Sequence, residues 1–138
     1  MPRILAIDYG TKRVGLAVTD PLKIIASALE TVHSKDVIVF LKTYLEIEEV
    51  EGFVVGMPVN LDGEDTNNTS HVKGFVKNLQ KTFPDIPVHL HDERFTSKIA
   101  LQAMISSGYS KKDRREKGNI DKISAVIILQ SYMEKEGI

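Results

Sequence analysis

The chain has 138 residues, a formal net charge of −1 and no cysteine. Its length suits one domain, residues 1–138, and its 42% apolar and 27% charged content is typical of a soluble globular protein. The composition excludes disulfides and thiolate metal sites. No apolar stretch reaches the roughly 20 residues that span a bilayer, and the N-terminus lacks the plan of a signal peptide. We therefore expect no membrane contact and a cytoplasmic protein.

The first part of the sequence predicts a β-hairpin and a third strand. Apolar runs over residues 3–8 and 13–19 lie on either side of a turn that contains Gly10 and Thr11. This spacing and turn chemistry are typical of two antiparallel strands. Residues 28–33 alternate between apolar and polar side chains, which indicates a half-buried strand.

Helices and strands alternate in the rest of the chain. Ser34 is a suitable N-cap for the first helix, and Gly108 can end the third. The predicted elements are a helix over residues 36–46, a strand over 52–58, a helix over 67–83, a strand over 86–93, a helix over 96–107 and a largely buried helix over 119–136. The apolar strand over 52–58 is typical of a central strand covered on both faces. The order predicts an α/β domain with a mixed five-stranded sheet flanked by helices.

Charge is concentrated in one predicted loop, residues 109–119. The loop has a local charge of +3 and includes Arg114 and Arg115. Such a segment can attract phosphates to an otherwise neutral domain. The alternative is a solvated connector, which is the usual reading of a charge run by itself.

Carboxylates stand at the ends of three predicted elements. Asp8 closes the first strand, Asp92 and Glu93 close the last strand, and Asp121 lies in the first turn of the last helix. Ligands of open α/β sheets bind at the carboxyl ends of strands. Hard cations such as Mg²⁺ and Mn²⁺ prefer carboxylate oxygens, and two such ions about 4 Å apart can activate water and stabilise a leaving oxygen. The pattern indicates a metal site.

Each of these acids also has a purely structural interpretation. Asp8 suits an Asx-turn, Asp121 suits the start of a helix, and Glu93 suits an ion pair with Arg94. The occurrence of all three at matching ends of one topology favours the metal site.

Four motifs carry a resemblance to a known family. DYGTKRVGLAVTD, VVGMPVNLDG, HDERFTS and IDKISAVIILQSY resemble, in order and spacing, the RuvX (YqgF) family of pre-16S rRNA nucleases, also called Holliday junction resolvases. The likeness covers essentially the whole chain and implies a ribonuclease H-like fold. It also implies that Asp8, Glu93 and Asp121 are the catalytic metal ligands. RuvC-like resolvases usually carry a fourth acid three residues after the helical aspartate, where this chain has Ser124.

Cations near the acids are candidates for nucleic-acid binding. Lys12 and Arg13 on the turn beside Asp8, and Arg94 beside Glu93, could hold phosphates, although surface solubility explains Lys12 equally well. The basic loop adds the two arginines named above.

Two further pairs have a structural or a functional interpretation. Asn60 and Asp62 could line a substrate groove or simply form a polar turn. His89 and His91 share a face of their strand at the spacing of a metal pair, but we interpret them as ordinary strand residues.

The resulting hypothesis is a nuclease that uses two Mg²⁺ or Mn²⁺ ions on structured RNA, with precursor ribosomal RNA as the substrate that the resemblance implies. Association with the ribosome would accompany this role. The alternatives are an endonuclease of branched DNA, which needs a homodimer rather than a monomer to cut a junction symmetrically, and a non-catalytic RNA-binding assembly factor. A sugar-kinase type of phosphotransferase also begins with a D-x-G-T hairpin, but it needs two lobes to enclose ATP.

Overall fold

The computed structural model describes residues 2–20, 22–23, 25–57, 69–92 and 117–137, and for residue 92 and residues 117–122 the description covers the backbone alone. Its strands are β1 (Arg3–Tyr9), β2 (Arg13–Thr19), β3 (Ala26–His33), β4 (Val50–Met57) and β5 (Val88–Asp92). Its helices are α1 (Val37–Ile47), α2 (Thr69–Thr82) and α5 (Lys117–Glu136).

The five strands form one mixed sheet in the order β3-β2-β1-β4-β5. β1, β2 and β3 form antiparallel pairs, whereas β4 runs parallel to both β1 and β5. The expected hairpin, the central position of the apolar strand β4 and the mixed five-stranded sheet are therefore confirmed. This order places β1 in the middle of the sheet, where its carboxyl end is flanked by β2 on one side and by β4 on the other.

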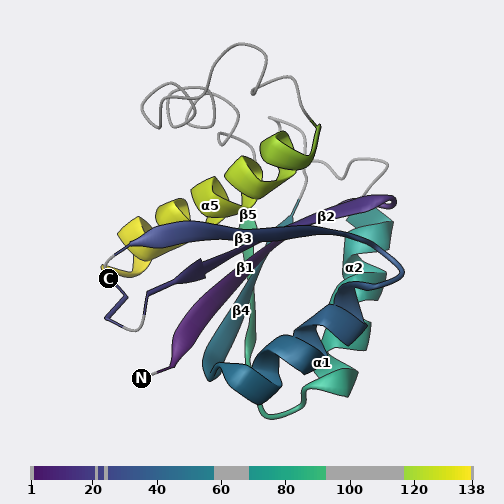
Figure 1. The fold of residues 1–138 in the computed structure, drawn as a ribbon, viewed down its shortest axis with the longest axis horizontal. Helices are drawn as coiled ribbons and strands as arrows, with labels where there is room; N and C mark the ends of the chain where they lie inside the picture. The colour runs from purple at the N-terminus through teal and green to yellow at the C-terminus, as the bar shows by residue number, and fades with distance from the viewer. Residues whose placement is uncertain (1, 21, 24, 58–68, 93–116, 138) are drawn as a thin grey trace.

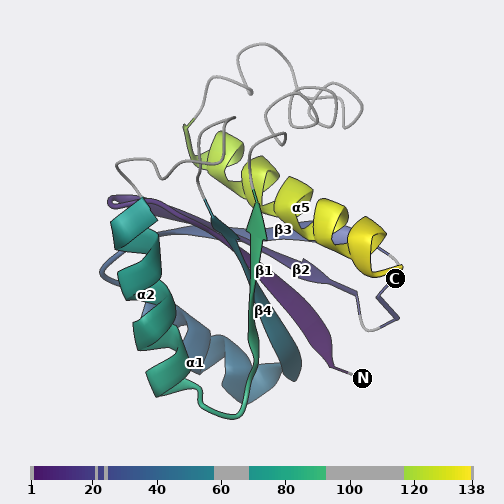
Figure 2. The same ribbon diagram turned by 180° about the vertical axis from the view of Figure 1, so that it is seen from behind.

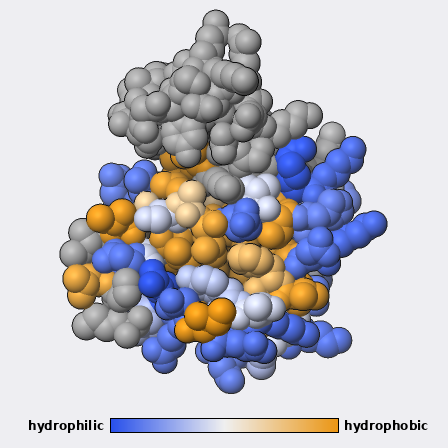
Figure 3. Space-filling model, in the orientation of Figure 1, coloured by the Kyte–Doolittle hydropathy of each residue, from blue (hydrophilic) through white to orange (hydrophobic). Residues whose placement is uncertain are grey.

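Helices cover both faces of the sheet. α1 and α2 lie on one face and α5 lies on the other, so that the sheet forms the middle layer (Figures 1 and 2). Among the described residues, no helix is long and apolar enough to cross a membrane. Seen from the β3 edge, apolar side chains gather in the middle of the molecule and hydrophilic ones form much of the rim (Figure 3).

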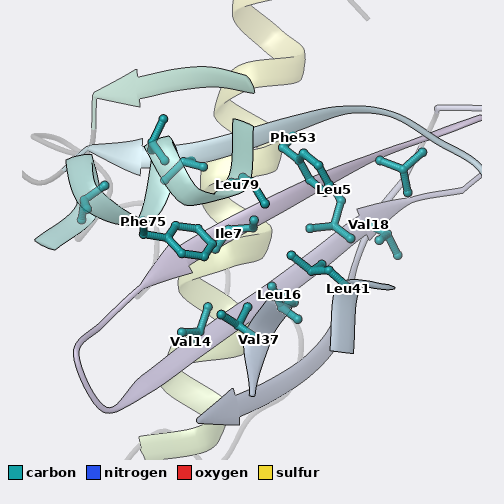
Figure 4. Close-up of a cluster of buried hydrophobic side chains, with 14 residues drawn as sticks. Leu5, Ile7, Val14, Leu16, Val18, Val37, Leu41, Phe53, Phe75 and Leu79 are labelled. Carbon is teal, nitrogen blue, oxygen red and sulfur yellow. The ribbon is translucent and has the colours of Figure 1, made fainter. Parts of the chain in front are cut away.

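Two clusters of buried side chains hold the layers together. The larger one, between the sheet and the helices α1 and α2, is built from every second residue of the central strands (Figure 4). Its buried members are Leu5, Ile7, Val14, Leu16, Val18, Val37, Leu41, Val50, Phe53, Val55, Val72, Phe75, Val76 and Leu79. The smaller cluster joins α5 to the other face. The burial expected for the last helix is confirmed over residues 123–129, where all side chains except the partly exposed Ser124 are buried.

The amino end of β1 is fixed by polar contacts. The Arg3 guanidinium donates from Nη1 to the Thr19 carbonyl oxygen at 2.9 Å and pairs through Nε with the Glu48 carboxylate at 3.2 Å. The Ile4 backbone N–H donates to the Thr19 hydroxyl oxygen at 3.0 Å. These contacts tie β1 to the end of β2 and to the residue after α1.

Most predicted boundaries differ from the observed ones by one or two residues. β3 begins at Ala26 because the ladder with β2 extends to Thr19, and β5 is shorter than the predicted strand over residues 86–93. The predicted helix over 96–107 lies outside the described residues. These shifts move no element to another place in the fold.

Two local predictions were wrong. Ser34 is not the N-cap of α1: Asp36 holds that position, and within the described segment 25–57 its side chain makes no cap hydrogen bond. The Ser34 hydroxyl instead donates to the Thr11 carbonyl oxygen, so a tertiary contact replaces the cap. The predicted loop over 109–119 is also too long, because α5 already begins at Lys117 despite the low helix propensity of the following glycine and asparagine.

Candidate active site

Asp8 lies near the carboxyl end of β1, on the face of the sheet that α5 covers. Ile4 and Ala6, the preceding residues of this face, pack against α5, and side chains alternate between faces along a strand. The antiparallel partner of Asp8 on β2 is Gly15. Gly15 is buried and contributes no side chain at the position directly opposite this carboxylate. Asp8 itself is partly exposed.

The turn after Asp8 requires glycine at position 10. The Gly10 N–H donates to the Arg13 carbonyl oxygen at 3.0 Å, and a Cβ atom at position 10 would lie 2.6 Å from that same oxygen. Such a contact is too short for any real Cβ atom, so the tight turn excludes a side chain there. The turn holds Lys12 and Arg13 exposed to solvent immediately beside the strand that carries Asp8.

The carboxyl ends of three parallel strands meet at one edge of the sheet. Ile7 of β1 pairs with Val55 of β4, and Met57 of β4 pairs with Asp92 of β5. Asp92 is the last residue of β5, and Glu93 is the next residue in the sequence. The register thus brings the positions of Asp8 and Asp92 to the same end of the sheet.

α5 begins at that same end of the sheet, as both ribbon views show (Figures 1 and 2). Asp121 is in its second turn, four residues before Ala125, which is fully buried against the sheet. Residues four apart share a helix face. Position 121 therefore belongs to the stripe of α5 that runs along the sheet.

Several predicted site residues lie outside the described part of the chain. They are Glu93, Arg94, Arg114, Arg115, Asn60 and Asp62. For Asp121 the backbone alone is described. Within the described residues, no group of three or more histidine, aspartate or glutamate side chains is arranged to hold a metal ion. The metal ligands therefore stay a prediction.

The two histidines of β5 both contact α5. His91 is buried, and its Nε2 lies 2.8 Å from the Ser131 hydroxyl oxygen. The His89 ring packs against Tyr132, with 5.6 Å between the ring centroids. The two side chains share a face of the strand, as predicted, and their described contacts join β5 to α5, in keeping with the interpretation as ordinary strand residues.

A cavity of about 250 Å³ lies at the opposite end of the sheet. It is lined by Ile4, Glu51, Gly52, His89 and Tyr132, which come from the amino ends of three strands and from the second half of α5. Burial raises the pKa of the Tyr132 phenol, and the nearby carboxylates of Glu136 and Glu51 raise it further. This cavity is remote from Asp8 and takes no part in the candidate active site.

Sequence reasoning missed the residues on β3 that accompany the turn. His33 is the cross-strand partner of Arg13, and Ser34 donates a hydrogen bond to the turn backbone. His33 and Arg13 become neighbours only through the pairing of β2 with β3. The only available sign in the sequence was that the third strand ends in a polar segment with His33 and Lys35.

Comparison with known proteins assigns the family. A family model described as RuvX, Holliday junction resolvase, matches residues 2–135. The chain belongs to the RuvX family. The match runs through nearly the whole chain, so it includes the first hairpin, the β5 motif and α5.

Curated RuvX relatives match at high identity. A protein of Amoebophilus asiaticus is 53% identical over 96% of this chain and 94% of its own length. A protein of Flavobacterium johnsoniae is 50% identical over 99% of each chain, and one of Phocaeicola vulgatus is 51% identical over 99% of this chain and 98% of its own. All three carry the name "Putative pre-16S rRNA nuclease".

Solved structures confirm the expected ribonuclease H-like fold. RuvC of T. thermophilus, solved with a Holliday junction substrate, aligns with a TM-score of 0.63 and 16% identity over 99% of this chain and 97% of its own. The Fowlpox virus resolvase, also solved with junction DNA, aligns with a TM-score of 0.61 and 17% identity over 97% and 98% of the two chains. The RuvX assignment and the curated relatives confirm the expected class of enzyme, a hydrolase of phosphodiester bonds.

Proposed function

We propose that this RuvX protein is a metal-dependent nuclease that acts on structured RNA and takes part in 5′-end processing of pre-16S ribosomal RNA. The observation that carries the proposal is the Asp8 carboxylate, which lies on the α5 face at the edge where the parallel strands end. Near-complete coverage of relatives that carry the rRNA nuclease name supports the choice of substrate. Such a role is cytoplasmic and brings the protein to the ribosome.

The residues at this edge suit Mg²⁺ or Mn²⁺. Asp8 offers a carboxylate on a partly exposed residue, and carboxylate oxygens are the ligands that these hard cations prefer. Asp8, Glu93 and Asp121 would hold two ions, with Ser124 in place of a fourth acid. When bound, the ions polarise the attacking water and stabilise the departing 3′ oxygen, which leaves a 5′-phosphate and a 3′-hydroxyl.

The chain's own cations would hold the substrate beside these acids. Lys12 and Arg13 are exposed on the turn next to Asp8, within reach of a scissile or neighbouring phosphate. Arg94, which follows Glu93 in the sequence, would do the same. Arg114 and Arg115 would add contacts to the backbone that do not depend on sequence.

Cleavage of a DNA junction is the second candidate, because the family description names a Holliday junction resolvase. Symmetric resolution of a four-way junction requires two active sites and hence a homodimer. Sedimentation with and without a synthetic junction tests this candidate. A strictly monomeric protein on the junction would contradict it.

A cleavage assay tests the proposed function directly. Wild-type protein and the Asp8→Asn variant are incubated with precursor rRNA fragments and four-way DNA junctions, with Mg²⁺ or Mn²⁺. We expect the wild type to cut the RNA and the variant to bind it without cutting, while both are folded. Equal cleavage by the variant would refute the metal site, and tight RNA binding without cleavage by the wild type would favour an assembly factor.

A further inference from the structure

His33 lies beside Arg13 on the same face of the sheet as Asp8. Arg13 and His33 are direct cross-strand partners in the antiparallel β2–β3 pair. Directly opposed residues point to the same face, with Cβ atoms about 4.5–5.5 Å apart. On β2, Arg13 is two residues from Gly15, the partner of Asp8, so all three side chains point to the α5 face.

Hydrogen bonds hold the end of β3 against the turn that carries Lys12. The Ser34 hydroxyl donates to the Thr11 carbonyl oxygen at 2.6 Å, and the Ser34 backbone N–H donates to the Lys12 carbonyl oxygen at 3.2 Å. The turn after Asp8 and the connection from β3 to α1 therefore form one corner of the molecule. Hydrophilic side chains form the rim on this side (Figures 1 and 3).

The chemistry of His33 suits an anionic partner. The Lys35 backbone N–H donates to the imidazole Nδ1 at 3.0 Å. A nitrogen that accepts a hydrogen bond carries no proton, so the neutral ring has its proton on Nε2. His33 is exposed, and its Nε2–H is thus an oriented donor that a phosphate oxygen can accept. Lys35, also exposed, adds a positive charge two residues away.

We propose that His33 and Lys35 bind a substrate phosphate that is distinct from the phosphate cleaved beside Asp8. β3 lies two strand spacings, about 10 Å, from β1, so the proposed contact at His33 is about that far from the strand that carries Asp8. The sugar-phosphate backbone of the RNA would run from Asp8 past Arg13 to the β3 edge. This inference rests on the proposed nuclease function and adds residues of β3 and of the β3–α1 connection to its binding surface.

The test measures binding of a fluorescent RNA hairpin with a single-stranded extension, in EDTA so that cleavage does not interfere. We expect His33→Ala and Lys35→Gln each to weaken binding about 3- to 10-fold, the range for loss of one hydrogen bond or charged contact. Lys35→Gln should also lower the slope of log affinity against log salt by about 1. Asp36→Asn, which removes the neighbouring negative charge, should strengthen binding.

Two replacements of His33 separate its contact with RNA from its local role. His33→Asn keeps an acceptor for the Lys35 N–H, whereas His33→Gln keeps a donor at the place of Nε2. We expect the glutamine variant to bind nearly as well as the wild type and the asparagine variant to bind as weakly as His33→Ala. In the cleavage assay, the variants that bind weakly, His33→Ala and His33→Asn, should have a higher KM and an unchanged kcat.

Lys81→Gln is the matched control, since this exposed lysine is in the last turn of α2 at the opposite end of the sheet. Wild-type affinity and salt slope in the His33 and Lys35 variants would overturn the inference. If Asp8→Asn still abolished cleavage while the His33 and Lys35 variants bound normally, the proposed nuclease function would remain and only the inference about His33 and Lys35 would fail. A wild-type protein that neither binds nor cuts RNA would overturn both.

Discussion

The buried imidazole of His91 on β5 lies 2.8 Å from the hydroxyl oxygen of Ser131 on α5. This contact joins the strand that ends directly before Glu93 to the helix that contains Asp121. It thus ties the strand that precedes one proposed metal ligand in the sequence to the helix that carries another.

Ser131→Ala should lower the free energy of unfolding by about 1 kcal/mol, because it removes a hydrogen-bond partner from a buried imidazole. Urea unfolding measures the change. Ser131→Thr keeps the hydroxyl and should retain most of the stability. If alanine and threonine had the same effect, the side-chain volume rather than the hydrogen bond would explain it.

Gly10→Ala should destabilise the protein by about 1–3 kcal/mol, because its Cβ would press on the Arg13 carbonyl oxygen. Gly74→Ala provides a matched control on the exposed side of α2, where an added Cβ meets nothing within 4 Å. That replacement should stabilise the helix by up to about 1 kcal/mol. Thermal unfolding of both variants measures the two changes in stability, which should have opposite signs. A Gly10→Ala variant as stable as the wild type would mean that the turn opens easily.

Mg²⁺ or Mn²⁺ should raise the unfolding temperature of the wild type but not of Asp8→Asn. An ion that binds only the folded state adds about 2.7 kcal/mol at 100 times its dissociation constant. An equal metal-induced shift in both proteins would exclude Asp8 from the ion site.

Changing Arg114 and Arg115 together to alanine should weaken RNA binding and flatten its salt dependence, as expected for lost phosphate contacts. Stability should hardly change, because exposed charges contribute little to it. Fluorescence titrations at several salt concentrations measure both quantities. Unchanged affinity and slope would identify the segment as a solvated connector.

Stability should fall as the pH rises above about 10, the ordinary pKa of tyrosine. Burial raises the pKa of Tyr44 and of Tyr132, so the folded state favours their neutral forms over the phenolates. This contribution is complete below the unfolded-state pKa and is lost as the pH rises through the folded-state pKa. The double variant with Phe at both positions lacks these phenols, so it should lose less stability over the same pH range in alkaline urea titrations. Identical pH profiles would contradict the prediction.

Hydrophobic periodicity was sufficient to predict the five strands and the three described helices. Apolar and polar residues alternate or recur with the period of each element, and turn residues such as Gly10 mark the ends. Boundaries were less certain because backbone pairing, as at Ala26, extends strands beyond their apolar residues. The role of Ser34 could not be predicted, because its partner is Thr11, 23 residues earlier in the chain.

For the candidate site, sequence was enough to select Asp8 and its two neighbouring cations. The structure adds the pairing of Asp8 with Gly15 and the pairing of Arg13 with His33, which follow from strand register. Register depends on the packing of a whole sheet and is not encoded in a local motif.

The helix α5 follows all five strands in the chain, yet it covers the face on which Asp8 lies. During synthesis on a ribosome, the sheet can therefore assemble while Ile4, Ala6, Ala17 and Val54 still lack their cover. The nascent chain exposes this apolar surface until α5 emerges from the ribosome. During that interval the surface is a target for chaperones. The proposed ligand on α5 is made with the same helix, so the proposed metal site has all its residues only once α5 has been synthesised.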